Sequence, residues 1–419
     1  MSDRCDIAII GSGAAGLAAG VFAAQAGREA GRRLRIVALD GAKSIGAKIL
    51  VSGGGRCNVT HDHITPADYN GSKIIVRNVL AGFDEKATAR WFESLGAPLK
   101  REEGGKMFPA SDSARTVVQA LVRRCGELDV RIRLGHRVEE IAPPVHRAAE
   151  FVVRHRHGEL LAARVIIATG GRALPGSGSD GSGYDLVRRL GHSVSETYPA
   201  LVPLLLDPSF FHKDLSGQSV EAELTTLSDG KAIDRRTGSL LWTHFGISGP
   251  VVLDASRHWV ISHATARTTQ MRCSFLPGHA FESMESRIIA LAASRPHQSI
   301  ARALGEPLPQ RLAQAIVTFV GIDPQTPLPH LSRQHRRQLV HAITAMTLPV
   351  VGDRGWNHAE VTAGGVPLAE IDYRTMESRK VPGLYLVGEI LDCDGRIGGF
   401  NFQWAWATGY LAGCSSGNF

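Results

Sequence analysis

Three glycines near the N-terminus have the spacing of a dinucleotide-binding loop. Gly11, Gly13 and Gly16 follow an apolar run at residues 7–10 and lead into an Ala-rich stretch, which predicts a strand, a tight turn and a helix. Gly11 permits the turn, Gly13 lets the backbone approach a diphosphate, and Gly16 lets the helix pack closely on the strand. Because free N–H groups at the start of a helix favour an anion, we expect a pyrophosphate to bind there.

A carboxylate follows at the place where the ribose of such a dinucleotide would lie. Residues 34–39 are predicted to form a second strand, and Asp40 follows it directly, 24 residues past Gly16. An acid at the end of this strand accepts hydrogen bonds from ribose hydroxyls. The alternative is a βαβ unit whose glycines serve packing alone, and that interpretation leaves Asp40 without a role.

A second glycine-rich loop follows at residues 46–58. Its three consecutive glycines let the backbone approach a bound group closely, and Lys48 and Arg56 could neutralise phosphate. Cys57 could act there as a proton donor or nucleophile, or it could be a small structural residue beside the cofactor. We take Arg56, Cys57 and Asn58 as candidate catalytic residues, with an ordinary flexible turn as the alternative.

Three later segments are predicted to return to the same cofactor. A buried strand ends in Ala-Thr-Gly-Gly at residues 168–171, and another strand ends at Glu389, an acid suited to the ribitol of FAD. A helix then opens at Gly398-Gly399, where backbone donors and the helix dipole would face the pyrimidine edge of a flavin. An ordinary capped helix is the alternative for that last segment.

The predicted cofactor is non-covalently bound FAD, since no His or Cys has a clear attachment signature. The predicted cofactor-binding residues are Gly11, Gly13, Ala14, Ala15, Gly16, Asp40, Gly41, Lys48, Gly54, Gly55, Arg56, Val138, Ala168, Thr169, Gly170, Gly388, Glu389, Gly398, Gly399, Phe400 and Asn401. No metal ligands are predicted.

Residues 176–181 also fit the GxGxxG spacing, but no apolar strand precedes them directly and no strand with a terminal acid follows. We therefore expect no second complete nucleotide domain, and NAD(P)H enters the prediction as a transient electron donor.

Composition narrows the class of protein. The 419 residues exceed one ordinary core, and 43% hydrophobic residues suit a globular α/β protein. The net charge of +7 is spread along the chain, so no nucleic-acid partner is expected. The six cysteines are scattered and form no CxxC pair, which argues against a disulfide framework or a zinc site. No apolar run reaches membrane-spanning length. The first predicted strand begins so early that we expect no signal peptide. The expected protein is soluble and cytoplasmic, with an oligomeric state that the sequence does not specify.

The predicted helices and strands divide the chain into four segments. Residues 1–193 are predicted as the first part of the FAD-binding domain, 194–280 as an inserted β domain, 281–346 as a helical subdomain, and 347–419 as the return to the FAD-binding domain. The basic stretch around residues 330–341 is interpreted as a solvated helix face. The predicted helices cover residues 84–95, 111–128, 184–190, 284–293, 308–320, 331–346 and 402–411.

With these motifs in place, the chain resembles the BaiN-like NAD(P)/FAD-dependent oxidoreductases, also described as aminoacetone-oxidase-type FAD-binding flavoproteins. The matching stretches are residues 11–16, 48–60, 168–171, 243–250, 360–366, 375–379 and 383–403. The resemblance implies a Rossmann-like FAD-binding domain of the glutathione-reductase or fumarate-reductase type, interrupted by an inserted β domain and a small helical domain. It does not identify a substrate.

The leading functional prediction is an FAD-dependent oxidoreductase that moves a hydride to or from a small organic substrate. The alternatives are a flavin oxidase or monooxygenase that uses oxygen, an RNA-modifying flavoprotein, and a non-catalytic flavin-binding module. The active site is expected in a cleft between the flavin domain and the insert, lined by residues 56–58, 243–250 and 398–401.

Overall fold

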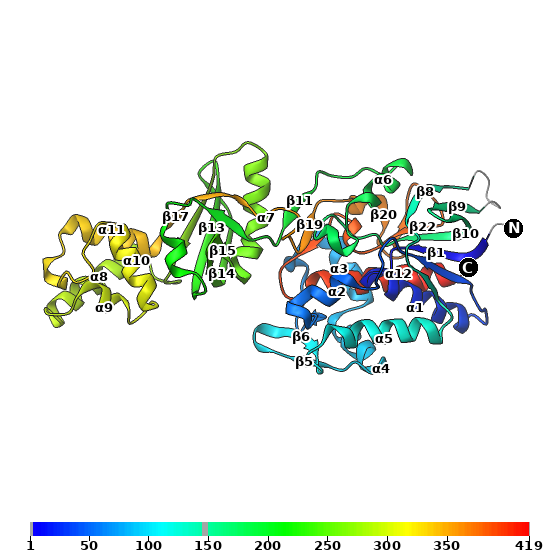
Figure 1. The fold of residues 1–419 in the computed structure, drawn as a ribbon, viewed down its shortest axis with the longest axis horizontal. Coiled ribbons are helices and arrows are strands. Elements are labelled where there is room, and N and C mark those ends of the chain that lie inside the picture. Colours follow the sequence, from blue (N-terminus) through cyan, green and yellow to red (C-terminus); the bar gives the residue numbers. More distant parts are fainter. Residues whose placement is uncertain (1–2, 145–149, 419) are drawn as a thin grey trace. The chain divides into compact units, whose positions relative to one another are not determined.

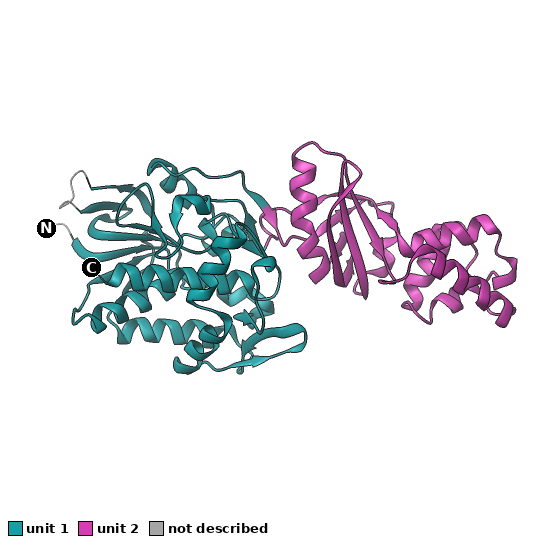
Figure 2. Ribbon diagram, turned by 180° about the vertical axis from the view of Figure 1, so that it is seen from behind, with its two compact units in different colours: residues 1–198, 360–419 teal, residues 199–359 magenta. Residues whose placement is uncertain are grey.

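The computed structural model describes residues 3–144 and 150–418 (Figure 1). The chain divides into two compact units, coloured separately in Figure 2. Unit 1 comprises residues 1–198 and 360–419, and unit 2 comprises residues 199–359. The expected return to the flavin domain at residue 347 precedes this division, because residues 346–353 hydrogen-bond within the sheet of unit 2.

The core of unit 1 is a sheet with parallel strands at its centre. The strand order is β20-β21-β22-β10-β1-β2-β7, and the antiparallel strands β9 and β8 continue from β10. The central strands are buried and apolar, as expected for parallel strands covered on both faces. The bounds are β1 Asp3–Ile10, β2 Ile36–Leu39, β7 Arg131–Arg133, β8 Val138–Ala142, β9 Phe151–His155, β10 Gly158–Ile167, β20 Ile371–Asp372, β21 Glu377–Ser378 and β22 Leu384–Leu386.

Two long helices bring the two ends of the chain together. Helix α1 (Ala14–Glu29) packs on β1, β2 and β10, and α12 (Phe400–Gly417) lies beside it (Figure 1). Their interface consists of small residues four apart, so the two backbones touch. A Cβ on any of the three α12 glycines would lie 2.6–2.7 Å from a carbonyl oxygen of α1. The facing residues are Gly409, Gly413 and Gly417 on α12 and Ala15, Ala19 and Ala23 on α1.

The remaining elements of unit 1 surround this core. Helix α4 (Glu85–Ser94) begins after Asp84, whose side chain accepts a hydrogen bond from the Ala87 N–H and so caps the start of the helix. The other helices are α2 Ala47–Val51, α3 Lys73–Gly82, α4 Glu85–Ser94, α5 Ala114–Glu127 and α6 Ser182–Arg189. The short strands are β3 Thr60–His61, β4 Tyr69–Asn70, β5 Leu99–Arg101, β6 Lys106–Pro109, β19 Val361–Ala363 and β23 Asp394–Gly395, while β11 Tyr198–Ala200 spans the division between units.

Unit 2 contains a second sheet and a group of helices. The strand order is β17-β16-β13-β14-β15-β12-β18. Its strands are β12 Leu204–Leu206, β13 Ser219–Ser228, β14 Lys231–Thr243, β15 Gly246–Ser248, β16 Thr269–Ser274, β17 Met346–Leu348 and β18 Val350–Asp353. Its helices are α7 Pro250–Ala264, α8 Phe281–Ser294, α9 Ile300–Leu304, α10 Gln310–Phe319 and α11 Arg333–Thr344. Among the described residues, no helix combines the length and apolar character needed to cross a membrane.

Candidate functional site

The carboxyl ends of four parallel strands bring the predicted cofactor segments to one edge of the unit 1 sheet. The Gly11 N–H donates to the carbonyl oxygen of Leu39 at 2.8 Å, which joins the ends of β1 and β2. The Ala168 N–H donates to Ile10 at 2.8 Å, and the Val387 N–H donates to Ile167 at 3.0 Å. This edge is where open α/β sheets bind their ligands.

The glycine loop leaves backbone donors free at this edge. Helix α1 has Gly13 as its N-cap, with no side-chain cap and no acid in the first turn. The Leu17 N–H donates to Gly13 at 2.9 Å, so the N–H groups of residues 14–16 precede the first intrahelical bond. A Cβ on Gly13 would meet no atom within 4 Å, whereas one on Gly11 would lie 2.4 Å from the carbonyl oxygen of Ala168. The loop therefore presents an open set of donors, as a diphosphate site requires.

Asp40 is held close to this loop. Its Oδ2 accepts a hydrogen bond from the Ser12 N–H at 2.6 Å, and its Oδ1 accepts one from the Ala42 N–H at 2.8 Å. Each oxygen keeps a further lone pair, and the residue is partly exposed. The carboxylate is thus oriented and can still accept from a hydroxyl.

Lys48 and Glu389, predicted for separate parts of the cofactor, pair with each other. Lys48 Nζ lies 2.5 Å from Glu389 Oε2, and the two side chains are 28% and 18% exposed. The other oxygen, Glu389 Oε1, accepts from the Thr362 N–H at 2.9 Å. The ion pair ties α2 to the turn after β22.

The loop at residues 52–58 contains four residues with positive φ angles, a backbone conformation that most residue types rarely adopt. Gly53, Gly54, Gly55 and Cys57 have φ values of 55°, 68°, 85° and 63°. Left-handed conformations of this kind cost glycine little, but they strain a residue with a Cβ. The Cys57 side chain is wholly buried, and burial raises the pKa of its thiol to about 12. These properties favour the structural alternative for Cys57 over a thiolate nucleophile.

Arg56 is already engaged by protein groups. Its Nη1 lies 2.7 Å from Glu102 Oε1 and 3.5 Å from Asp112 Oδ1, and its guanidinium stacks 4.1 Å above the ring of Phe108. Hydrogen bonding to Glu102 raises the pKa of Arg56, which therefore stays cationic. The arginine anchors the β5–β6 hairpin to the loop.

The start of α12 meets the same loop. Gly399 is the N-cap, with φ of 96° and no side-chain cap. A Cβ on it would lie 2.9 Å from Asn58 Oδ1. The Asn401 side chain accepts from the Gly395 N–H at 2.8 Å and donates to the Gly395 carbonyl at 3.0 Å, so it fixes the turn before the helix. The Phe400 ring stacks on His61 at 4.9 Å between ring centroids.

The other predicted residues lie at the margins of this edge. A Cβ on Gly388 would lie 3.0 Å from the Cβ of Ala15, and Gly41 packs against Arg137, one residue before Val138. Val138 is buried at the start of β8. Within the described residues, no polar side-chain contact connects Val138 to the glycine loop.

Residues 5–415 match the family model described as the HI0933-like protein Rossmann domain. The chain belongs to the HI0933-like family. This confirms the family resemblance expected from the sequence, and the HI0933-like chain is an FAD-dependent oxidoreductase with a Rossmann-like FAD-binding domain.

Relatives of known name cover nearly the whole HI0933-like chain. It is 35% identical over 408 residues to the 3-dehydro-bile acid delta(4,6)-reductase of Clostridium scindens, covering 97% of this chain and 98% of that protein. It is 33% identical over 411 residues to the ribosomal RNA dihydrouridine synthase of Escherichia coli, covering 97% of each chain. The enzyme with the same name from Haemophilus influenzae is 32% identical over 418 residues, covering 99% of each.

Two solved structures share the fold of this chain over nearly its whole length. The 3-ketosteroid delta1-dehydrogenase of Sterolibacterium denitrificans aligns with a TM-score of 0.53 at 12% identity, covering 99% of this chain and 100% of that one. A flavocytochrome c3 fumarate reductase aligns with a TM-score of 0.50 at 15% identity, covering 99% of this chain and 78% of that one. The predicted fumarate-reductase type of fold is thus confirmed.

Two supporting residues of the HI0933-like chain were not predicted from the sequence. Thr362 Oγ1 accepts from the backbone N–H groups of Arg172 and Ala173 at 2.7 and 3.0 Å, which shapes the loop after β10. Gln403, wholly buried in α12, accepts from the hydroxyls of Thr60 and Thr88 at 2.7 and 2.9 Å. The sequence did offer one indication of the Gln403 hydrogen bonds, because a glutamine within an otherwise apolar helix needs polar partners.

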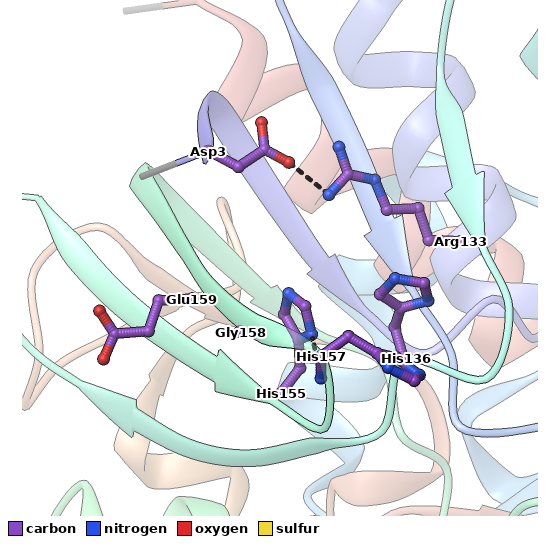
Figure 3. Close-up of a pocket in the computed structure, with 7 residues that line it drawn as sticks. All are labelled: Asp3, Arg133, His136, His155, His157, Gly158 and Glu159. Atoms are coloured by element: carbon purple, nitrogen blue, oxygen red, sulfur yellow. Dashed lines mark hydrogen bonds and ion pairs between the residues drawn. The ribbon is translucent and has the colours of Figure 1, made fainter. Parts of the chain in front are cut away.

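A separate hollow on unit 1 contains three histidines (Figure 3). The His136 ring lies 5.0 Å from that of His155 and 4.8 Å from that of His157, and Asp3 pairs with Arg133 nearby. Within residues 3–144 and 150–418, no group of three or more His, Cys, Asp or Glu side chains is arranged to hold a metal ion.

Proposed function

We propose that the HI0933-like chain is a reductase that saturates a carbon–carbon double bond conjugated to a carbonyl group. In the overall reaction one hydride goes to the carbon β to the carbonyl and one proton goes to the α carbon. NAD(P)H supplies the two electrons and leaves as NAD(P)⁺. Bound FAD supplies the hydride chemistry, while the protein supplies position and electrostatics.

The names of the relatives carry this proposal. A 3-dehydro-bile acid delta(4,6)-reductase acts, by its name, on double bonds conjugated to a 3-keto group. A dihydrouridine synthase saturates the C5–C6 bond of uracil, which is conjugated to the C4 carbonyl. The substrates differ greatly, but the bond that is reduced has the same electronic character in both.

The residues at the sheet edge fit FAD and suggest how the chain would hold it. The free N–H groups at the start of α1 would bind the diphosphate, and Asp40 would accept from the ribose. The Lys48–Glu389 pair would lie on the ribitol side, and the first turn of α12 would face the flavin pyrimidine ring. Binding would be non-covalent. We propose that the other cofactor-binding residues predicted from the sequence also contact FAD.

The first experiment tests the electron donor. Purified yellow protein is mixed anaerobically with NADH or with NADPH, and flavin absorbance is followed. We expect bleaching by one of the two, then recolouring when a Δ4-3-keto steroid is added. Recolouring by oxygen alone, with an oxidised or hydroxylated organic product, would support the oxidase or monooxygenase alternative instead.

A second candidate function is reduction of uridine in ribosomal RNA. It is favoured by the two relatives with that name, which match 97–99% of this chain at 32–33% identity. The expectation of no nucleic-acid partner conflicts with these names. The test is incubation of the reduced protein with unmodified ribosomal RNA, followed by mass spectrometry of the nucleosides. A uridine that gains two hydrogens supports this function, and an unchanged nucleoside profile beside a reduced steroid excludes it.

A further inference from the structure

The side chain of Asn58 is nearly enclosed yet makes no hydrogen bond. The residue is 8% exposed, and its Oδ1 is buried without a partner. Its Nδ2 also has no hydrogen-bond partner among the described residues. Native proteins pair the great majority of buried carboxamides, and an unpaired one costs stability. A buried carboxamide without a protein partner suggests that a bound ligand supplies its hydrogen bonds.

The first turn of α12 supplies a second, independent feature at the same place. A Cβ on Gly399 would lie 2.9 Å from Asn58 Oδ1, so the carboxamide stands directly beside the N-cap of this 18-residue helix. The first intrahelical bond runs from the Gln403 N–H to Gly399 at 3.0 Å, which leaves the N–H groups of residues 400–402 as donors.

The neighbouring polar side chains are already committed to protein partners. Arg56 pairs with Glu102, and Asn401 bonds the backbone of Gly395. Among the side chains that the sequence placed at this loop and helix start, the carboxamide of Asn58 is the one whose hydrogen-bonding groups remain unpaired.

A carboxamide beside a row of N–H donors matches an imide edge, in which an N–H group stands between two carbonyl oxygens. The amide oxygen can accept from the imide N–H, and the amide NH₂ and the helix N–H groups can donate to the two carbonyls. The pyrimidine ring of flavin has this edge, with N3–H between the C2 and C4 carbonyls. The uracil base has the same edge.

We infer that Asn58 and the first turn of α12 form the recognition site for the imide edge of the flavin. The inference rests on the proposed function in that FAD must bind at this sheet edge. It makes Asn58 a cofactor-binding residue rather than one that takes part in proton transfer.

The test compares FAD with N3-methyl-FAD, in which a methyl group replaces the imide hydrogen. Apoprotein is titrated with each, and dissociation constants are measured by flavin fluorescence. The variants are Asn58→Leu, which keeps the volume and removes the amide, and Asn401→Ala as the matched control. Thermal unfolding of each apoprotein checks the fold.

We expect the wild type to bind N3-methyl-FAD about tenfold more weakly than FAD. In Asn58→Leu the affinity for FAD should fall by a similar factor and the preference between the two flavins should vanish. Asn401→Ala should weaken both flavins equally, because its amide holds the turn before α12. The Asn58→Leu apoprotein should unfold at the same or a higher temperature, whereas a structural role for the amide would lower that temperature.

A second arm separates flavin from uracil. Holoprotein is titrated with uridine 5′-monophosphate and with its N3-methyl derivative. The flavin assignment would be overturned if the protein prefers uridine 5′-monophosphate over its N3-methyl derivative, loses that preference in Asn58→Leu, and shows no such preference between FAD and N3-methyl-FAD. In that case Asn58 would recognise the imide edge of a substrate base. Equal binding of both flavins by the wild type would overturn it as well. A wild type that binds no FAD would instead contradict the proposed function itself.

Discussion

The thiol of Cys57 lies wholly inside unit 1, and burial raises its pKa to about 12. At neutral pH such a thiol carries almost no thiolate, so it is a poor nucleophile. We therefore expect Cys57→Ser to keep bound FAD and to change the rate of flavin reduction by NAD(P)H less than about threefold.

The measurement is anaerobic stopped-flow absorbance on protein whose FAD content has been determined. A rate that falls about a hundredfold with FAD still bound would show that Cys57 takes part in proton transfer. Serine is the suitable replacement because its side chain is of similar size and places the same demand on the left-handed backbone at this position.

At this scale the sequence predicts where side chains lie along the chain but not what they pair with. Arg56 was expected to neutralise phosphate, yet its partners Glu102 and Asp112 are 46 and 56 residues away. Lys48 meets Glu389 across 341 residues. Such pairs depend on the completed fold, so no local pattern of charge could reveal them.

The contact between α1 and α12 can be tested at the scale of elements. A Cβ on Gly413 would lie 2.7 Å from the carbonyl oxygen of Ala19, so Gly413→Leu must force the helices apart. Overpacking of this kind costs about 1–3 kcal/mol, and we expect a fall of about 2–12 °C in the thermal midpoint together with weaker FAD binding.

Gly126 in α5 provides the matched control. A Cβ there would meet no atom within 4 Å, and alanine favours helix over glycine by about 0.5–1 kcal/mol. Gly126→Ala should leave the midpoint unchanged or raise it slightly. If Gly413→Leu behaves in the same way, the close contact between the helices is not what holds them together.

The same glycines explain where sequence-based prediction of elements fell short. The C-terminal helix was expected at residues 402–411, but α12 runs from Phe400 to Gly417. Glycine usually signals a helix end, whereas Gly413 and Gly417 serve close packing on α1. The helix predicted to reach Met346 ends at Thr344, because residues 346–348 pair with β16. The βαβ core was predictable because its strands are apolar runs and its turns require glycine.

For the whole molecule, the buried histidines predict instability in acid. Burial lowers the pKa values of His155, His192 and His212 below the usual 6.5. The unfolded chain takes up protons at these positions near pH 6.5, while the folded chain does so only at lower pH. The contribution of these three histidines to the free energy of unfolding is therefore highest above about pH 6.5, and it falls as the pH drops below that value.

Urea unfolding midpoints at pH 7.5 and pH 5.5 measure this effect. We expect a lower midpoint at pH 5.5, and a smaller difference in His192→Gln, which removes one of the buried groups. The matched control is His335→Gln on the exposed surface of α11, which should keep the full difference. An unchanged midpoint between the two pH values would contradict the prediction.

Two arginines of α11 already have protein partners, which predicts that they are not an RNA-binding surface, even if ribosomal RNA proves to be the substrate. Arg336 Nε and Arg337 Nη1 lie 3.3 and 3.7 Å from the two carboxylate oxygens of Glu285. The Arg337 guanidinium also stacks 5.0 Å from the ring of Phe281. Arginines that already pair with a carboxylate neutralise fewer phosphates, so an RNA that contacts them releases fewer of its own counterions.

We therefore expect the double variant Arg336→Gln, Arg337→Gln to bind ribosomal RNA as the wild type does, with the same dependence of log K on log salt concentration. Filter binding over a series of salt concentrations measures both quantities. If the two arginines do bind phosphates, the salt slope should fall by about one for each phosphate that is no longer neutralised, and binding should weaken on every RNA sequence. That result would place nucleic acid on unit 2 and restore the basic helix as a functional surface.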